Sequence, residues 1–165
     1  MKSPIARLSL VAGLLVATTV AAQSPGLFPF PHRINDYAHQ KTRTATRSHI
    51  SSGDTLRYLN AQVLYTSEKD SLWIFWSRFA DEKAARFMMQ QMLSNIRSNK
   101  GNYQEPTSDV VLGVPIHSTA KKGRAHFFFR KKEQIFWLAG SPGQCYLFLK
   151  DFLKKTGLAS DAKSK

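Results

Sequence analysis

Short strand-like segments separated by turn signals dominate the second half of the sequence, and they restrict the fold more than any other feature. Residues 125–130 and 134–139 are rich in aromatic and branched side chains, and each is preceded by a turn signal, Lys-Lys-Gly or Lys-Lys-Glu. With residues 110–117 before them, they predict a three-stranded antiparallel meander. Pro115 cannot donate a hydrogen bond to a neighbouring strand, so the first of the three strands is expected at a sheet edge or with a bulge.

Two further strands and a helix precede this meander. Residues 57–66 form one strand-like segment, and residues 72–76 are apolar at every position, as in a central strand covered on both faces. The polar residues 67–70 mark the turn between them. In residues 81–100 apolar side chains recur every three to four positions, which predicts an amphipathic helix with one face on the sheet.

A second helix is expected from Ser141 to about Lys155, because serine can cap a helix and Pro142 suits its first position. The predicted element order is therefore ββαβββα. The fold class that follows is α+β, with an antiparallel sheet of five strands, or slightly more, and two packed helices. Residues 55–157 are expected to form this single domain.

The first 22 residues have the three parts of a cleavable signal peptide. A cationic start is followed by an uncharged apolar run over residues 8–20 and by small residues before a cut after Ala22. This pattern predicts export without a transmembrane anchor, to the periplasm of a Gram-negative host and otherwise to the medium. Because Cys145 is the single cysteine, no disulfide can form within the chain, and the domain must be stable through packing.

Residues 23–54 begin with a proline-rich arm and continue as a polar segment. The prolines restrict the arm to extended conformations, which excludes a helix. Its large apolar side chains, Leu27, Phe28 and Phe30, are expected to fix an extended arm to the body, with a mobile leader as the alternative, and the same residues are the candidate partner-binding arm. In the polar segment only a short strand near residues 44–50 is expected. Residues 158–165 are predicted to be a frayed, charged tail.

Positive charge is the clearest compositional feature. The net charge is +13, and it falls to +11 when the signal peptide is removed. Such a charge favours association with anionic surfaces but does not specify any chemistry. The two meander turns lie beside three consecutive phenylalanines, which fits either stacking of bases or a strand buried on both faces with solubilising charges beside it. The candidate anion-binding residues are Lys121, Lys122, Arg124, Arg130, Lys131 and Lys132.

Catalytic motifs are not apparent. Cys145 or a serine would be the nucleophile, with His117 or His126 as a base, but no diagnostic spacing connects them. Cys145 falls on the inner face of the last helix, which favours a buried core residue. The histidines are scattered, and the methionines near residue 90 suit core packing as well as copper binding. The sequence therefore predicts no metal, no cofactor and, on balance, no enzymatic activity.

We therefore expect an exported envelope protein that binds a protein, an apolar ligand or an anionic ligand through a sheet face or through the arm. One alternative is a small exported hydrolase whose Cys or Ser and His side chains are brought together only by the fold. The other is a polyanion binder that uses the basic turns for lipopolysaccharide, a glycan or nucleic acid. Export makes intracellular nucleic acid an unexpected partner.

Overall fold

The structure is a computed structural model, and it describes residues 26–51, 54–98 and 102–159. The predicted signal peptide and most of the predicted charged tail lie outside these ranges, so both stay predictions. None of the described helices is long and apolar enough to cross a lipid bilayer.

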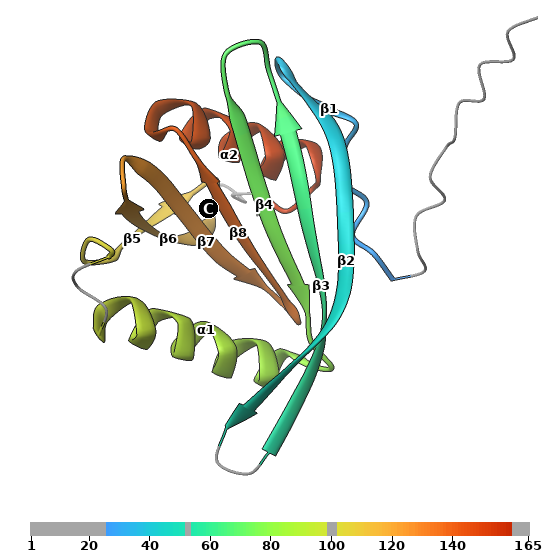
Figure 1. Cartoon of the computed structure of the whole chain (residues 1–165), viewed down its shortest axis with the longest axis vertical. Coiled ribbons are helices and arrows are strands. Elements are labelled where there is room, and N and C mark those ends of the chain that lie inside the picture. The colour runs from blue at the N-terminus through green and yellow to red at the C-terminus, as the bar shows by residue number, and fades with distance from the viewer. Residues whose placement is uncertain (1–25, 52–53, 99–101, 160–165) are drawn as a thin grey trace, which may run out of the picture.

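The described residues form one antiparallel sheet and two helices (Figure 1). In the sheet the strands follow the order β1-β2-β3-β4-β8-β7-β6-β5. Every neighbouring pair in this order consists of strands that follow one another along the chain, except β4 and β8. The elements, in chain order, are β1 (Arg33–Ile34), β2 (Tyr37–Ser51), β3 (Asp54–Thr66), β4 (Ser71–Arg78), α1 (Glu82–Ser98), β5 (Thr107–Val111), β6 (Val114–Lys121), β7 (Arg124–Lys131), β8 (Gln134–Gly140) and α2 (Pro142–Lys155).

The predicted five-stranded sheet and the order ββαβββα are wrong, because the described sheet has eight strands. The long strand β2 was expected only near residues 44–50, since its polar sequence lacks the apolar alternation of a half-buried strand. Residues 110–117 do not form one strand either. They contain a turn at Leu112 and Gly113, whose φ angles of 50° and 74° reverse the chain between β5 and β6.

Pro115 lies in β6, where it pairs with Val110 of the edge strand β5. The pairing of β6 with β7 begins only at His117, so β6 has a single strand partner at the proline. The missing N–H group therefore leaves no gap in a second ladder, which explains why the proline is tolerated.

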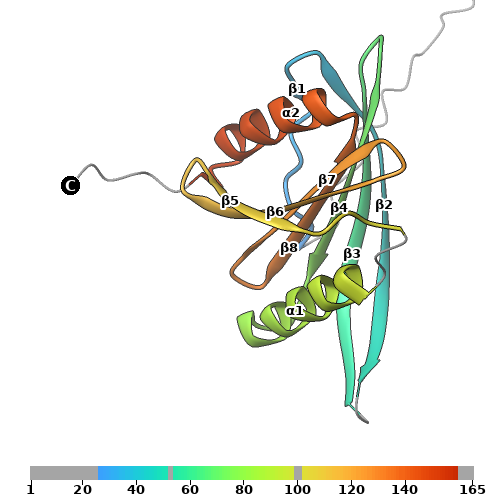
Figure 2. The ribbon, with the colours of Figure 1, turned by 90° about the vertical axis from the view of Figure 1, so that its left-hand side faces the viewer.

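The sheet is curled, and each of its faces carries one helix (Figures 1 and 2). On one face α2 packs through Phe148 and Phe152 against β3, β4, β7 and β8. On the opposite face α1 packs through Ala85 and Met89. Figure 2 shows α1 between the lower ends of β7 and β8 and the long β2–β3 ribbon. The two faces of the central strands are thus covered by different helices.

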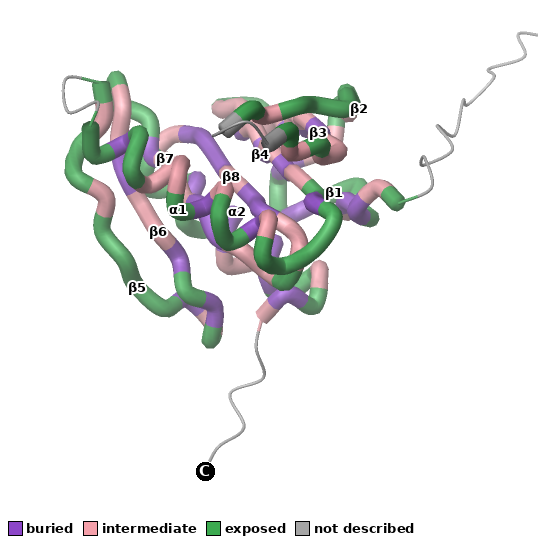
Figure 3. Tube along the Cα trace, turned by 90° about the horizontal axis from the view of Figure 1, so that it is seen from below, coloured by how far each residue is buried: buried purple, intermediate pink, exposed green. Residues whose placement is uncertain are grey.

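The three consecutive phenylalanines of β7 follow this division of the sheet. Phe128 belongs to the core under α1, whereas Phe129 and the half-buried Phe127 pack in the core under α2. This confirms the reading of β7 as a strand with apolar contacts on both faces. Figure 3 shows the contrast between the buried β8 and the exposed edge strands β2 and β5.

The proline-rich arm packs on the same face as α2. Phe28 lies 5.0 Å from Phe136 between ring centroids, and Phe30 lies 6.4 Å from Trp76. Both phenylalanines are buried, and the Tyr65 hydroxyl donates a hydrogen bond of 2.7 Å to the Pro31 carbonyl. The arm is therefore fixed to the body, the first of its two expected roles, and its partner-binding role stays a prediction.

Candidate functional site

An apolar pocket of about 260 Å³ lies between α1 and the sheet face that α1 covers. We call this pocket the groove. Side chains of β3, β4 and β8 form its floor, and α1 with the residue before it forms its wall. Its lining residues are Tyr58, Phe75, Ser77, Phe79, Met88, Met92, Ile135 and Trp137.

Alternation along β4 explains the floor of the groove. Leu72, Ile74 and Trp76 point toward α2 and are buried, so the intervening Trp73 and Phe75 point toward the α1 face. These two side chains are only half-buried. The sequence predicts cover on both faces of residues 72–76, whereas the structure leaves the second face partly open.

The wall of the groove comes from the amphipathic face of α1. Met88 and Met92 lie one helical turn apart, so they project side by side toward the sheet. Both are half-buried, whereas Met89 is buried in the core beside them. Methionine side chains are flexible and polarizable, and they adapt to ligands of different shape.

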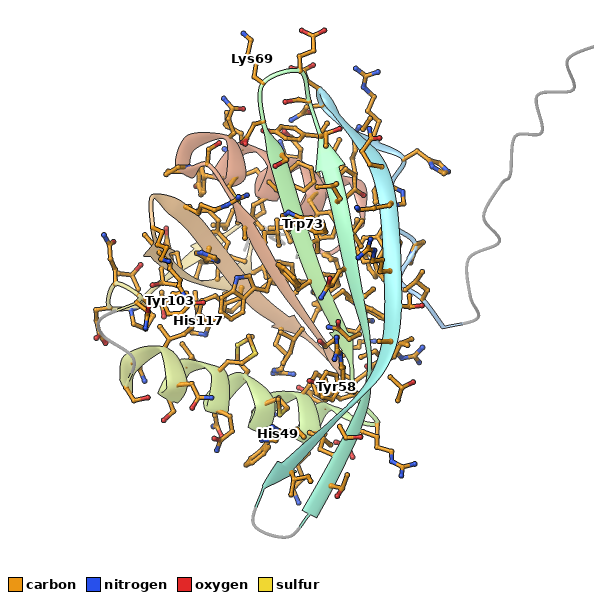
Figure 4. The ribbon with its side chains drawn as sticks, viewed as in Figure 1. His49, Tyr58, Lys69, Trp73, Tyr103 and His117 are labelled. Carbon is orange, nitrogen blue, oxygen red and sulfur yellow. The ribbon has the colours of Figure 1, made fainter. Side chains whose placement is uncertain are left out.

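Aromatic contacts fix the ends of the groove. At one end the rings of Tyr58 and Phe79 stack with centroids 4.9 Å apart. Farther along the sheet, Trp137 stacks on Phe128 at 5.0 Å. Figure 4 shows Tyr58 near one end of α1 and His117 toward the other. The rings are held by their neighbours, so the pocket is largely formed before a ligand binds.

A strip of apolar surface continues from the groove along the sheet. Trp73 stacks beside Phe75 with ring centroids 6.3 Å apart, and Leu64 is its cross-strand neighbour on β3. At the end of the strip the ammonium group of Lys41 lies 5.9 Å from the centroid of the Trp73 ring. A cation–π contact therefore places a positive charge next to the apolar strip.

The β2–β3 ribbon that borders this strip is strongly basic. It contains Lys41, Arg43, Arg47 and Arg57 and a single acidic residue, Asp54. Register places Lys41, Arg43 and Arg47 opposite Leu64, Gln62 and Tyr58, which lie on the same side of the sheet as the groove. The charge near the groove is therefore predominantly positive.

A polar cluster lies on the same sheet face beyond Trp137. The Trp137 indole N–H donates a hydrogen bond of 2.9 Å to Nδ1 of His126. Burial, together with the charges of Arg124 and Lys121, lowers the pKa of His126 below its ordinary value. His126 is therefore neutral at neutral pH, and it serves as an acceptor that orients the indole ring at the groove.

The six predicted anion-binding residues do not form one patch. Lys121, Lys122 and Arg124 lie at one end of β7, and the other three lie at its opposite end, roughly 25 Å away for an eight-residue strand. The structure therefore places the six residues as two small cationic groups, one at each end of β7.

Several of these six cations already have partners. Arg130 bonds Glu82 at 2.7 Å, and Lys131 reaches the Leu158 carbonyl at 3.4 Å. Arg124 donates to backbone carbonyls of β4 and β8. Lys121 lies 4.4 Å from the centroid of the Tyr103 ring. Anion binding by these residues stays a prediction, and Lys122, Arg124 and Lys132 are the exposed members of the six.

Cys145 is buried in the core under α2, as the sequence favoured. Burial raises the pKa of its thiol to about 12. The predicted bases lie elsewhere, because His117 and His126 are on strand positions that face the α1 side of the sheet. The fold therefore does not bring this cysteine and either histidine together.

A larger recess of about 600 Å³ lies at the other end of the molecule, around the β3–β4 turn and the start of α2. Cationic and anionic side chains both line it. Its central carboxylate, Asp70, accepts hydrogen bonds from the hydroxyl groups of Ser141 and of Tyr37, the latter at 3.2 Å. We favour the smaller groove as the site, because the central polar groups of this recess, Asp70, Ser141 and Tyr37, already bond one another.

The described residues contain no group of three His, Cys, Asp or Glu side chains placed to hold a metal ion. Fold and site together define a curled antiparallel sheet with one helix on each face and an apolar groove under α1. The chain matches no family model, no curated protein and no solved structure.

Proposed function

We propose that the protein binds a small amphipathic molecule, with an apolar body and one anionic group, in the groove and along the strip beside it. The observation that carries this proposal is the half-exposed apolar floor of β4. Trp73 and Phe75 are only half-buried between α1 and a cationic ribbon, and a bound ligand that covered the rest of their apolar surface would be stabilised by its burial.

The shape of the groove supports an apolar body. Ligand sites are typically concave, mostly apolar and largely preformed, with few polar groups. Here Ser77 is the only hydroxyl-bearing aliphatic side chain among the lining residues, and its hydroxyl is already bonded to Asn60 at 3.1 Å. A volume of about 260 Å³ suits a short or medium acyl chain better than a polycyclic ligand.

The charge distribution supports an anionic group. Lys41 stands at the end of the apolar strip, and β3 and β4 together contain one acidic residue, Asp54, which is the first residue of β3. An anionic headgroup at this position would be attracted by the Lys41 ammonium group, whereas a cationic headgroup would be repelled by it. The expected ligand class is therefore a carboxylate or phosphate with an apolar chain.

A direct test compares three probes with the same chain, namely decanoate, decanol and decyltrimethylammonium. Each is titrated into residues 23–165 below its micelle concentration, while tryptophan fluorescence and thermal unfolding are recorded. Decanoate is expected to change the emission of Trp73 and Trp137 and to raise the melting temperature, because a ligand that binds only the native state stabilises it. The cationic probe is expected to bind weakest.

Matched variants locate the site. Phe75→Ala should weaken decanoate binding, whereas Phe87→Ala should not, because Phe87 is exposed on α1 and does not line the groove. Lys41→Glu should remove the preference for decanoate over decanol, and Lys83→Glu on α1 should preserve it. Equal binding of the three probes, or decanoate binding that Phe75→Ala leaves unchanged, would overturn the proposal.

A further inference from the structure

The outer edge of β2 is a long open strand edge. β1 pairs with β2 only through Tyr37 and Ala38, and one further bond joins the His39 amide to the His32 carbonyl at 2.9 Å. From residue 40 to residue 51, β3 is the one strand partner of β2 in the described part of the chain. Its outward N–H and C=O groups therefore have no strand beside them.

The β2 edge is neither short nor interrupted by proline, and its protection is limited to cationic side chains and a register irregularity between His39 and Lys41. Natural edge strands are short, or carry prolines, or are covered. β2 has 15 residues and no proline, whereas the opposite edge strand, β5, has five. The pairing of β3 with β4 ends at Leu59 and Arg78, so the ribbon projects beyond the body of the sheet (Figure 1). An incoming strand would meet no obstruction from α1 or α2 there.

Side chains on β2 give this edge a chemical preference. Every residue from 43 to 48 is exposed. Arg43 and Arg47 project on one face, and the hydroxyl-bearing Thr44, Thr46 and Ser48 project on the other. No acidic residue occurs anywhere in β2. Cross-strand pairs of opposite charge stabilise a sheet, and like charges directly opposite destabilise it.

This charge pattern argues against a second copy of the same strand. In an antiparallel pair of two β2 strands centred on Ala45, Arg43 of each copy would lie opposite Arg47 of the other. Other registers still bring cations near cations, since β2 carries no acid to compensate them. The edge is therefore open to pairing but repels its own copy.

We propose that the β2 edge of residues 40–51 binds an extended acidic segment of a partner protein, which adds a strand to the sheet. Main-chain hydrogen bonds would supply affinity, and glutamate or aspartate at alternate positions would pair with Arg43 and Arg47. This inference does not require ligand binding in the groove, because it uses the main-chain edge of β2 with Arg43 and Arg47, although Lys41 lies on the same strand and all three cations share the groove side of the sheet.

The test uses a labelled peptide that alternates glutamate with valine, and two controls. One control has lysine in place of glutamate, and the other keeps the glutamates but replaces the valines by proline. Binding to residues 23–165 is measured by fluorescence anisotropy at about 50 and about 200 mM salt, the range over which screening of exposed charges increases. Hydrogen exchange of the β2 amides is recorded with and without peptide.

The acidic peptide is expected to bind, to weaken as salt increases and to protect the amides of residues 40–51 from exchange. The proline and lysine peptides should bind at least roughly tenfold more weakly, a difference of about 1.4 kcal/mol. Arg43→Glu combined with Arg47→Glu should abolish acidic binding, whereas Lys83→Glu combined with Lys154→Glu, on exposed helix positions, should not.

Three results would overturn the proposal. The first is equal binding of the acidic and proline peptides, which would show charge attraction without strand addition. The second is acidic binding with no protection of the β2 amides. The third is concentration-dependent protection of β2 without peptide, which would show that a second copy of the chain occupies the edge.

Discussion

Trp137 donates its indole N–H to Nδ1 of His126 across the β7–β8 pair, with the two rings nearly perpendicular at 84°. The bond requires a free lone pair on Nδ1, so the imidazole must be neutral with its proton on Nε2. Protonation would place two donors face to face. A lining residue of the groove is therefore oriented by a histidine whose pKa is lowered below its ordinary value, mainly by burial.

We predict that the free energy of unfolding decreases as the pH falls below about 6.5, the ordinary histidine pKa. The pKa of His126 is lowered in the folded state, so the unfolded chain binds protons first and gains stability relative to the fold. Burial also lowers the pKa values of His39 and His117, which contribute in the same direction. Urea unfolding at about pH 7.5 and about pH 5 measures the change.

The His126→Gln variant measures the contribution of His126 to this pH dependence, because glutamine can still accept a hydrogen bond but does not titrate. The decrease between these pH values should be smaller in this variant than in the wild type. The carboxyl groups of Asp70 and Glu82 do not confuse the comparison, because their pKa values are lowered from 3.8 and 4.5 and both stay ionised. An identical decrease in both proteins would contradict the assignment.

Cys145 should not react with thiol reagents in the native protein. Its thiol is buried and its pKa is raised to about 12, so almost no thiolate exists at pH 8. Labelling by a thiol reagent should become fast only in denaturant. Rapid stoichiometric labelling of the native chain would instead support the alternative hypothesis of a hydrolase that uses Cys145 as its nucleophile.

Gly140 should be sensitive to the smallest substitution, because a Cβ atom there would lie 3.3 Å from Cβ of Cys145 and from a methyl group of Leu72. Gly140→Ala is therefore expected to destabilise the fold by about 1–3 kcal/mol through overpacking. Gly143→Ala is a suitable control, since nothing lies within 4 Å of its added Cβ. Equal melting temperatures for the two variants would be inconsistent with this packing.

Phe30→Ala is expected to lower stability by about 3 kcal/mol, the usual cost of removing a buried phenylalanine ring. The ring is 4% exposed and contacts Trp76 and Phe28. Pro29→Ala, at an exposed position of the same arm, should cost much less. Chemical denaturation measures both variants, and a neutral Phe30→Ala would show that the arm is not part of the core.

Asp70→Ala should destabilise the protein by about 1 kcal/mol or more, because the carboxylate joins the β3–β4 turn to the first residue before α2. Burial alone would raise the pKa of Asp70, but hydrogen bonds from Ser141, Ser71 and Tyr37 outweigh it and lower the pKa. Its contribution is therefore present above about pH 4 and is lost as the pH falls further. The difference in stability between wild type and variant should disappear in strong acid.

Apolar periodicity was enough to predict both helices and the strands of the central sheet. The sequence places helices over residues 81–100 and near 141–155, close to the observed α1 and α2. It failed for β2 because a strand exposed on both faces needs no apolar alternation. It failed at residues 110–117 because Leu112 is an unusual residue for a left-handed turn position.

The groove was less accessible to sequence reasoning than the fold. Met88 and Met92 have the spacing of core residues, and nothing in that spacing reveals that the opposing strand surface is only half covered. The sequence did contain one signal. Trp73 and Phe75 are large, and α1 already packs on Phe128 and Ile135, so one helix cannot cover all of these side chains. Recognising it requires the strand order, which local patterns do not contain.

The pairing of β4 with β8 has a consequence for how the chain assembles. All other neighbouring strands in the sheet are consecutive in sequence, so two contiguous hairpin arrays, β1–β4 and β5–β8, meet along a single seam. Contacts between residues close in sequence form early, and the distant seam forms late. A chain cut between α1 and β5 should therefore yield two fragments that reassemble into the folded sheet when they are mixed, through the pairing of β4 with β8.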